Sequence, residues 1–155
     1  MNFAKKVYLA QIITYGILIT LLSLVVVFTA GLFIVSKVGN ISSDKALDYA
    51  LLLVLMIIAS AVALGFIFLL VFQLVTSIKL YKSLKTSSAD FLSRKKSRAI
   101  NTTFGILSII GGVVTGLLSS DIFLCLAVLI IPATVFAFLI LDKIALSKIK
   151  KETVA

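Results

Sequence analysis

Apolar residues dominate four long stretches of the chain, and the charged residues gather between them. The stretches cover approximately residues 7–35, 49–75, 99–118 and 122–141, and none contains an Asp, Glu, Lys or Arg. Each reaches the ~20 apolar residues that a helix needs to cross the hydrocarbon core of a bilayer. The pattern predicts an all-α protein with four transmembrane helices.

The connections between the stretches are too short to form a second hydrophobic core. We therefore expect a single membrane domain over residues 1–155. The first two helices and the last two helices would form two antiparallel hairpins. A basic cytoplasmic loop, residues 76–98, would join them.

The basic residues alternate between the two ends of the stretches. Of 15 Lys and Arg residues, 13 lie before the first stretch, between the second and third, or after the fourth. Because Lys and Arg accumulate on the cytoplasmic side, both termini are expected in the cytoplasm. The short loops and lysine-rich ends fit a bacterial plasma membrane. This topology accounts for the net charge of +9, and without a recognisable motif no nucleic-acid partner is expected.

Reactive side chains are scarce. The chain has no histidine and a single cysteine, Cys125, so the commonest metal ligand and general base is missing. No carboxylate lies inside an apolar stretch. Asp121 and Asp142 border the fourth one, and we interpret both as helix caps or interface charges. We therefore expect neither enzymatic activity nor a metal ion or cofactor.

The third stretch carries the most specific feature, a stripe of small and polar residues at helical spacing. It includes a GxxxG element, which lets two helix backbones approach closely in lipid. Packing against a neighbouring helix of the same chain is the favoured interpretation. Contact with a protein partner or a second copy, or the lining of a pore, are the alternatives. The stripe consists of Asn101, Gly105, Ser108, Gly112, Thr115 and Gly116.

Three side-chain amides are expected at a similar depth near the cytoplasmic ends of the helices: Gln11, Gln73 and Asn101. Amides at that depth form hydrogen bonds between helices. We favour this structural role over a binding site. The first helix also carries a weaker line of small residues, Gly16, Thr20, Ser23 and Ala30.

Pro132 lies near the middle of the fourth stretch. A proline removes one backbone hydrogen bond and kinks a helix. Membrane helices tolerate such kinks, so a static bend is the favoured interpretation and a gating hinge the alternative.

The basic loop ends in a dense cationic cluster, Arg94, Lys95, Lys96 and Arg98. Clusters of this kind attract anionic lipid headgroups at the cytoplasmic face. The topology rule explains the cluster equally well.

These observations favour a non-enzymatic membrane protein that acts through helix packing, as an accessory, regulatory or immunity-type subunit of a membrane complex. The alternative is a small homo-oligomeric channel or transporter with a polar path lined by the third helix. Either function involves a protein partner or self-association in the membrane.

Overall fold

The computed structural model describes residues 2–38, 46–118 and 122–154, and these residues are helical almost throughout, with no strand. Four of the helices are long and apolar enough to cross a membrane, as the sequence predicts. The helices are α1 (Asn2–Val38), α2 (Ala46–Thr86), α3 (Ser88–Ser93), α4 (Lys95–Leu118) and α5 (Ile122–Val154).

Helical structure continues beyond the apolar stretches on the side of the termini. The expected loop over residues 76–98 is largely helical, because α2 runs to Thr86 and α3 and the start of α4 occupy the rest. Ser87 separates α2 from α3: it has extended backbone angles, and its hydroxyl accepts a hydrogen bond from the Asp90 amide at 3.0 Å. A serine in this position caps the first turn of a helix. The fourth predicted helix was expected to end at 141, but α5 continues to Val154.

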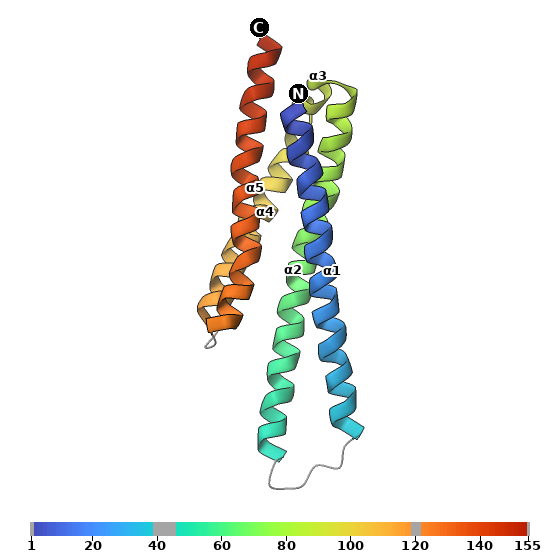
Figure 1. The fold of residues 1–155 in the computed structure, drawn as a ribbon, viewed down its shortest axis with the longest axis vertical. Coiled ribbons are helices and arrows are strands. Elements are labelled where there is room, and N and C mark those ends of the chain that lie inside the picture. Colours follow the sequence, from blue (N-terminus) through green and yellow to red (C-terminus); the bar gives the residue numbers. More distant parts are fainter. Residues whose placement is uncertain (1, 39–45, 119–121, 155) are drawn as a thin grey trace.

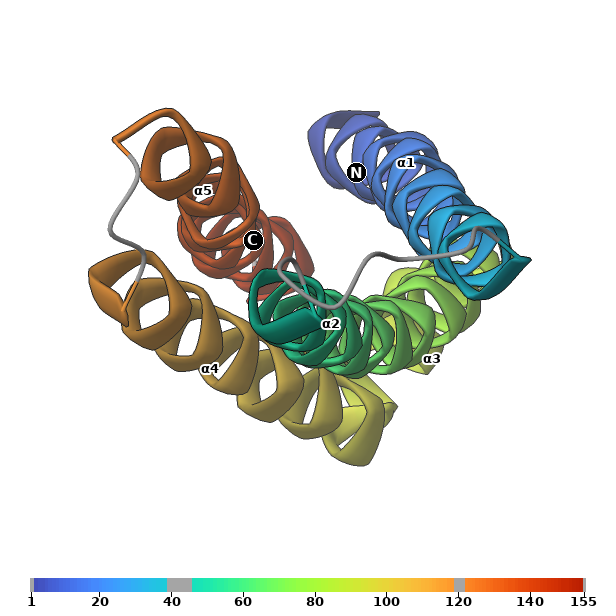
Figure 2. The ribbon, with the colours of Figure 1, turned by 90° about the horizontal axis from the view of Figure 1, so that it is seen from below.

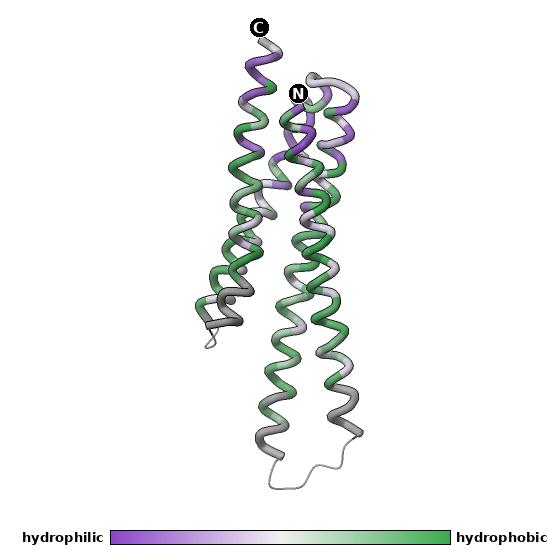
Figure 3. The backbone as a smooth tube through the Cα atoms, viewed as in Figure 1, coloured by the Kyte–Doolittle hydropathy of each residue, from purple (hydrophilic) through white to green (hydrophobic). Residues whose placement is uncertain are grey.

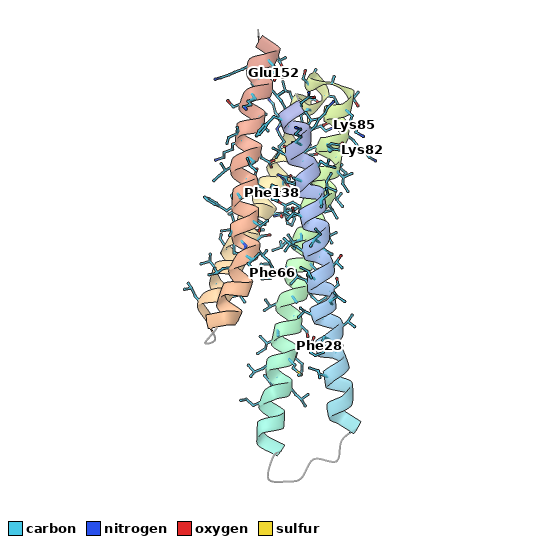
Figure 4. All side chains as sticks on the ribbon, viewed as in Figure 1. Phe28, Phe66, Lys82, Lys85, Phe138 and Glu152 are labelled. Atoms are coloured by element: carbon cyan, nitrogen blue, oxygen red, sulfur yellow. The ribbon has the colours of Figure 1, made fainter. Side chains whose placement is uncertain are left out.

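The long helices form two pairs. α1 lies beside α2 and α4 beside α5, while α2 packs against α4 and α1 makes fewer contacts with α5 (Figures 1 and 2). α3 and both termini lie at one end of the bundle (Figure 1). At the other end α1 and α2, with 37 and 41 residues, extend past α4 and α5. Phe28, labelled in Figure 4, belongs to this extension and is 67% exposed.

Each long helix buries positions that are alternately three and four residues apart. Such spacing places a continuous seam on one side of a helix and is typical of knobs-into-holes packing. On α2 the seam is Phe66, Leu70, Gln73, Ser77, Leu80 and Leu84, all at most 6% exposed.

The buried apolar residues of these seams form two clusters at different positions along the bundle axis. In the cluster near the termini, the Tyr8 and Phe91 rings meet edge to face with centroids 5.7 Å apart. In the second, Phe66 and Val135 are buried, and Phe138 packs against the cluster with its ring edge to face with that of Tyr15; Phe66 and Phe138 are labelled in Figure 4. Hydrophilic residues are concentrated at the end of the bundle that carries the termini (Figure 3). Apart from Ser83, which lies beside Leu84 in the cluster near the termini, the buried polar residues lie between the two clusters.

Candidate functional site: a buried polar layer

Asp142 is the centre of the polar residues inside the bundle. It is half-buried and lies on the seam of α5, seven residues after Val135 and three before Ala145, and therefore points at the other helices. Gln11 Nε2 of α1 donates to one carboxylate oxygen at 2.7 Å. Asn101 Nδ2 of α4 donates to the other at 2.9 Å. One carboxylate thus joins three helices.

The interpretation of Asp142 as a helix cap is wrong, and its position relative to the membrane interface stays a prediction. Asp142 lies well inside α5, so it ends no helix, and both of its oxygens accept hydrogen bonds from neighbouring helices. The fourth apolar stretch itself contains no carboxylate, but the helix continues past it, so Asp142 lies in a helix interior. Asp121 and the side chain of Cys125 lie outside the described residues.

α2 completes the layer with hydroxyl groups and an amide. Ser77 Oγ donates to Gln11 Oε1 at 2.9 Å, so this amide contacts α2 and α5 at once. Thr76 Oγ1 lies 3.2 Å from Asn101 Oδ1 and can donate to it, in competition with backbone carbonyls of its own helix. We define the polar layer as the residues that form these contacts, together with a neighbouring pair on α2 and α4: Gln11, Gln73, Thr76, Ser77, Asn101, Ser108 and Asp142.

The pair Gln73 and Ser108 lies beside this network. Gln73 Nε2 donates to Ser108 Oγ at 3.3 Å, and Ser108 Oγ donates to the Phe104 carbonyl at 2.9 Å. Gln73 Oε1 is buried and has no hydrogen-bond partner within the described part of the chain. The amide therefore uses its donor but not its acceptor.

The geometry of the layer fixes the axial register of the helices. Sliding one helix by a turn would separate amide donors from the Asp142 oxygens, and a buried polar group without a partner costs about 1–3 kcal/mol. An apolar seam would tolerate such a shift better, because dispersion contacts are not directional. The polar layer therefore selects one packing of the four long helices.

Gln11 and Asn101 lie at the same depth, since both donate to Asp142, and Gln73 lies about one helical turn further from the termini, where it contacts Ser108. The amides do not bond to one another, however. Asp142 joins two of them and hydroxyl groups join the rest to α2 and α4. The sequence analysis missed Asp142 and Ser77, although both positions continue the three-and-four spacing of their helices.

The small-residue stripe of α4 packs inside the chain. A Cβ atom on Gly112 would lie 2.7 Å from two ring carbons of Pro132, and one on Gly105 would lie 2.9 Å from a methyl group of Leu139. Both contacts are on α5, so this face is covered there. Of the remaining members, Asn101, Ser108 and Gly116 are buried and Thr115 is half-buried. The favoured internal packing therefore holds, and these glycines are closed to a partner or a pore.

Pro132 acts as the packing partner of Gly112. Its ring fills the space that the missing glycine side chain leaves. Nearby, Thr134 Oγ1 donates to the Ile130 carbonyl at 2.7 Å. Both the static bend and the gating hinge at Pro132 stay predictions.

The basic cluster divides into two parts. Arg98 donates to the Phe91 carbonyl and, at 3.0 Å, to the Leu92 carbonyl, and its guanidinium lies 5.1 Å from the centre of the Phe91 ring. It therefore fastens the end of α3 to α4. Lys95 and Lys96 are exposed, and Arg94 pairs with Asp90 at 3.6 Å on the surface. Of the four residues, Lys95 and Lys96 are the ones that are exposed and for which the described part of the chain shows no such contact.

Four long apolar helices, whose exposed surface is rich in large hydrophobic side chains, define an integral membrane protein of the all-helical class. In comparisons with known proteins, no family model, curated protein or solved structure matches the chain. The functional argument therefore depends on this chain alone.

Proposed function

We propose that this protein is a non-enzymatic accessory, regulatory or immunity-type subunit of a membrane complex, and that it binds its partner through α1. The observation that carries the proposal is that the small-residue face of α1 is uncovered. The corresponding face of α4 is closed by α5. In lipid, small residues promote association because they let helix backbones approach closely.

The uncovered face flanks the buried seam of α1: Gly16 and Ser23 are half-buried, and Thr20 and Ala30 are exposed. A Cβ atom on Gly16 or Gly31 would meet no other atom within 4 Å. The Thr20 hydroxyl donates to the Gly16 carbonyl at 2.9 Å, and the Ser23 hydroxyl to the Ile19 carbonyl at 2.8 Å. The face therefore offers a shallow surface without unpaired hydroxyl donors, which suits a close helix–helix contact.

The proposed topology has two antiparallel hairpins with both termini in the cytoplasm of a bacterium. The positive-inside rule supports it, because 13 of the 15 basic residues lie on the side of the termini. The concentration of hydrophilic residues at that end of the bundle agrees with this orientation (Figure 3).

A small channel or transporter is the second candidate, and the polar layer is what favours it. An ionisable residue inside a membrane protein often marks an ion or proton path. Within one chain, however, the layer is bounded on the side away from the termini by the apolar cluster of Tyr15, Phe66, Leu70 and Val135. A path would therefore require an oligomer or a rearranged bundle, and flux into proteoliposomes containing only this protein would support it.

Gly16→Leu is expected to abolish co-purification of the partner. The added side chain enters open space in the chain itself, so the bundle folds normally, but it keeps a second helix from approaching α1. The measurement is native mass spectrometry of the complex extracted gently from its membrane. We expect at least a ten-fold loss of a stoichiometric second protein.

Gly65→Leu is the matched control, since a Cβ on Gly65 of α2 also meets nothing within 4 Å. It should leave the complex unchanged. Equal amounts of complex with both variants, or a wild-type protein that forms only homo-oligomers, would contradict the proposal. The latter result would favour the channel or transporter.

A further inference from the structure

A groove of about 400 Å³ runs between α4 and α5, and Asp142 is the one member of the polar layer that lines it. This volume lies within the range of pockets that hold small ligands. Its walls are open sideways, because Ile106 is 48% exposed and Ile110 and Phe136 are 55% and 56% exposed. In a membrane helix, such residues face the lipid.

The groove is amphipathic along the bundle axis. Arg98 and Thr102 line its end on α4 nearer the termini, and Lys143 lines the same end on α5. Further along α4 the lining becomes apolar, with Ile106 and Ile110. The stretch from residue 98 to 110 is about 18 Å long at 1.5 Å per residue. A phospholipid has the same order of groups along the membrane normal.

The charge of the polar end suits an anion. Arg98 and Lys143 contribute two positive charges, against one carboxylate, Asp142. Both oxygens of that carboxylate already accept hydrogen bonds from the amides of Gln11 and Asn101. The exposed Lys143 ammonium and the remaining guanidinium N–H groups of Arg98 are therefore available to a phosphate.

We infer that this groove binds one anionic phospholipid, with its phosphate between Arg98 and Lys143 and an acyl chain along Ile106, Ile110 and Phe136. This site differs from the diffuse attraction that the exposed Lys95 and Lys96 exert on a headgroup layer. It requires both a positive end and an open apolar groove, whereas a basic surface requires only charge.

The test measures phosphatidylglycerol binding to the full-length protein in detergent, by native mass spectrometry, with phosphatidylcholine of the same acyl chains for comparison. We expect one phosphatidylglycerol retained per chain, at a lower Kd than phosphatidylcholine. Lys143→Gln should weaken this binding about five-fold, the effect of one basic residue near a phosphate. Lys150→Gln removes an exposed charge from the same helix outside the groove and should change Kd less than two-fold.

A second pair of variants tests the apolar part. Ile106→Trp should fill the groove and weaken binding at least five-fold. Leu107→Trp is the control, because Leu107 is 47% exposed on the same helix and does not line the groove. Equal retention of both lipids, equal effects of the two lysine variants, or no effect of Ile106→Trp would each overturn the inference. Glycerol phosphate has the headgroup chemistry without acyl chains. If it displaced the lipid at a concentration near the Kd of the lipid, the inference would also be overturned, because the site would then recognise a free phosphate.

Discussion

Replacing Asp142 with leucine is expected to lower the free energy of unfolding by about 2–4 kcal/mol. The carboxylate accepts hydrogen bonds from Gln11 Nε2 at 2.7 Å and from Asn101 Nδ2 at 2.9 Å. Leucine has a similar size but accepts neither bond, so two amide donors lose their partner between the helices. The measurement is the unfolding of the purified protein by SDS in mixed micelles.

Asp142→Asn is the control, because it keeps the shape of the side chain and part of its hydrogen bonding but removes the charge. Asparagine has one acceptor oxygen, which can keep the bond from Asn101. Its NH₂ group would face Gln11, whose amide can turn over and donate to the Ser77 hydroxyl instead. We therefore expect a loss of about 1 kcal/mol or less. If the leucine variant is as stable as wild type, the polar layer does not hold the helices in register.

Gly112→Leu is expected to lower the free energy of unfolding by about 3 kcal/mol. Even its Cβ atom would lie 2.7 Å from Cγ and Cδ of Pro132, well inside the 3.5–4.0 Å at which two carbons attract. The proline ring cannot turn aside, so α4 and α5 must separate. The same SDS titration measures this change.

Gly16→Leu is the control for this loss of stability. A Cβ at Gly16 meets no atom within 4 Å, and leucine favours a helix more than glycine does. The stability should therefore stay the same or rise slightly. Equal destabilisation by Gly112→Leu and Gly16→Leu would contradict the close contact between Gly112 of α4 and Pro132 of α5.

The sequence predicts the four long helices because length and unbroken hydropathy decide which segments can cross a bilayer. Hydropathy does not indicate where a helix ends once it leaves the lipid. For this reason the final turns of α5, and all of α3, were expected as loop or tail. Only at the end of α2 does the helical spacing of apolar residues, such as Leu84, indicate that the helix continues. Leu84 and Ile149 are both buried at the end of the bundle near the termini.

Asp142 was missed because the end of an apolar stretch was treated as the end of the helix. The seam of α5 continues through it, from Ile131 and Val135 to Ala145 and Ile149. Following the three-and-four spacing beyond the apolar stretch would have indicated that this carboxylate points inwards.

The two small-residue faces could not be ranked from sequence, because α1 and α4 carry similar patterns. Packing decides between them. Tyr8 and Tyr15 are buried on one side of α1, and Gly16 lies at the edge of that side, where a Cβ atom would meet no other atom within 4 Å. On α4, Pro132 of the neighbouring helix fills the space beside Gly112.

The most direct test of the proposed function is photocrosslinking in the native membrane. A photoreactive residue would replace Thr20, on the uncovered face of α1, or Val114, which is 49% exposed on α4. We predict a protein adduct of one defined mass from position 20 and only lipid adducts from position 114. Lipid adducts alone from both positions, or the same protein adduct from both, would contradict the role of α1 as the partner-binding helix.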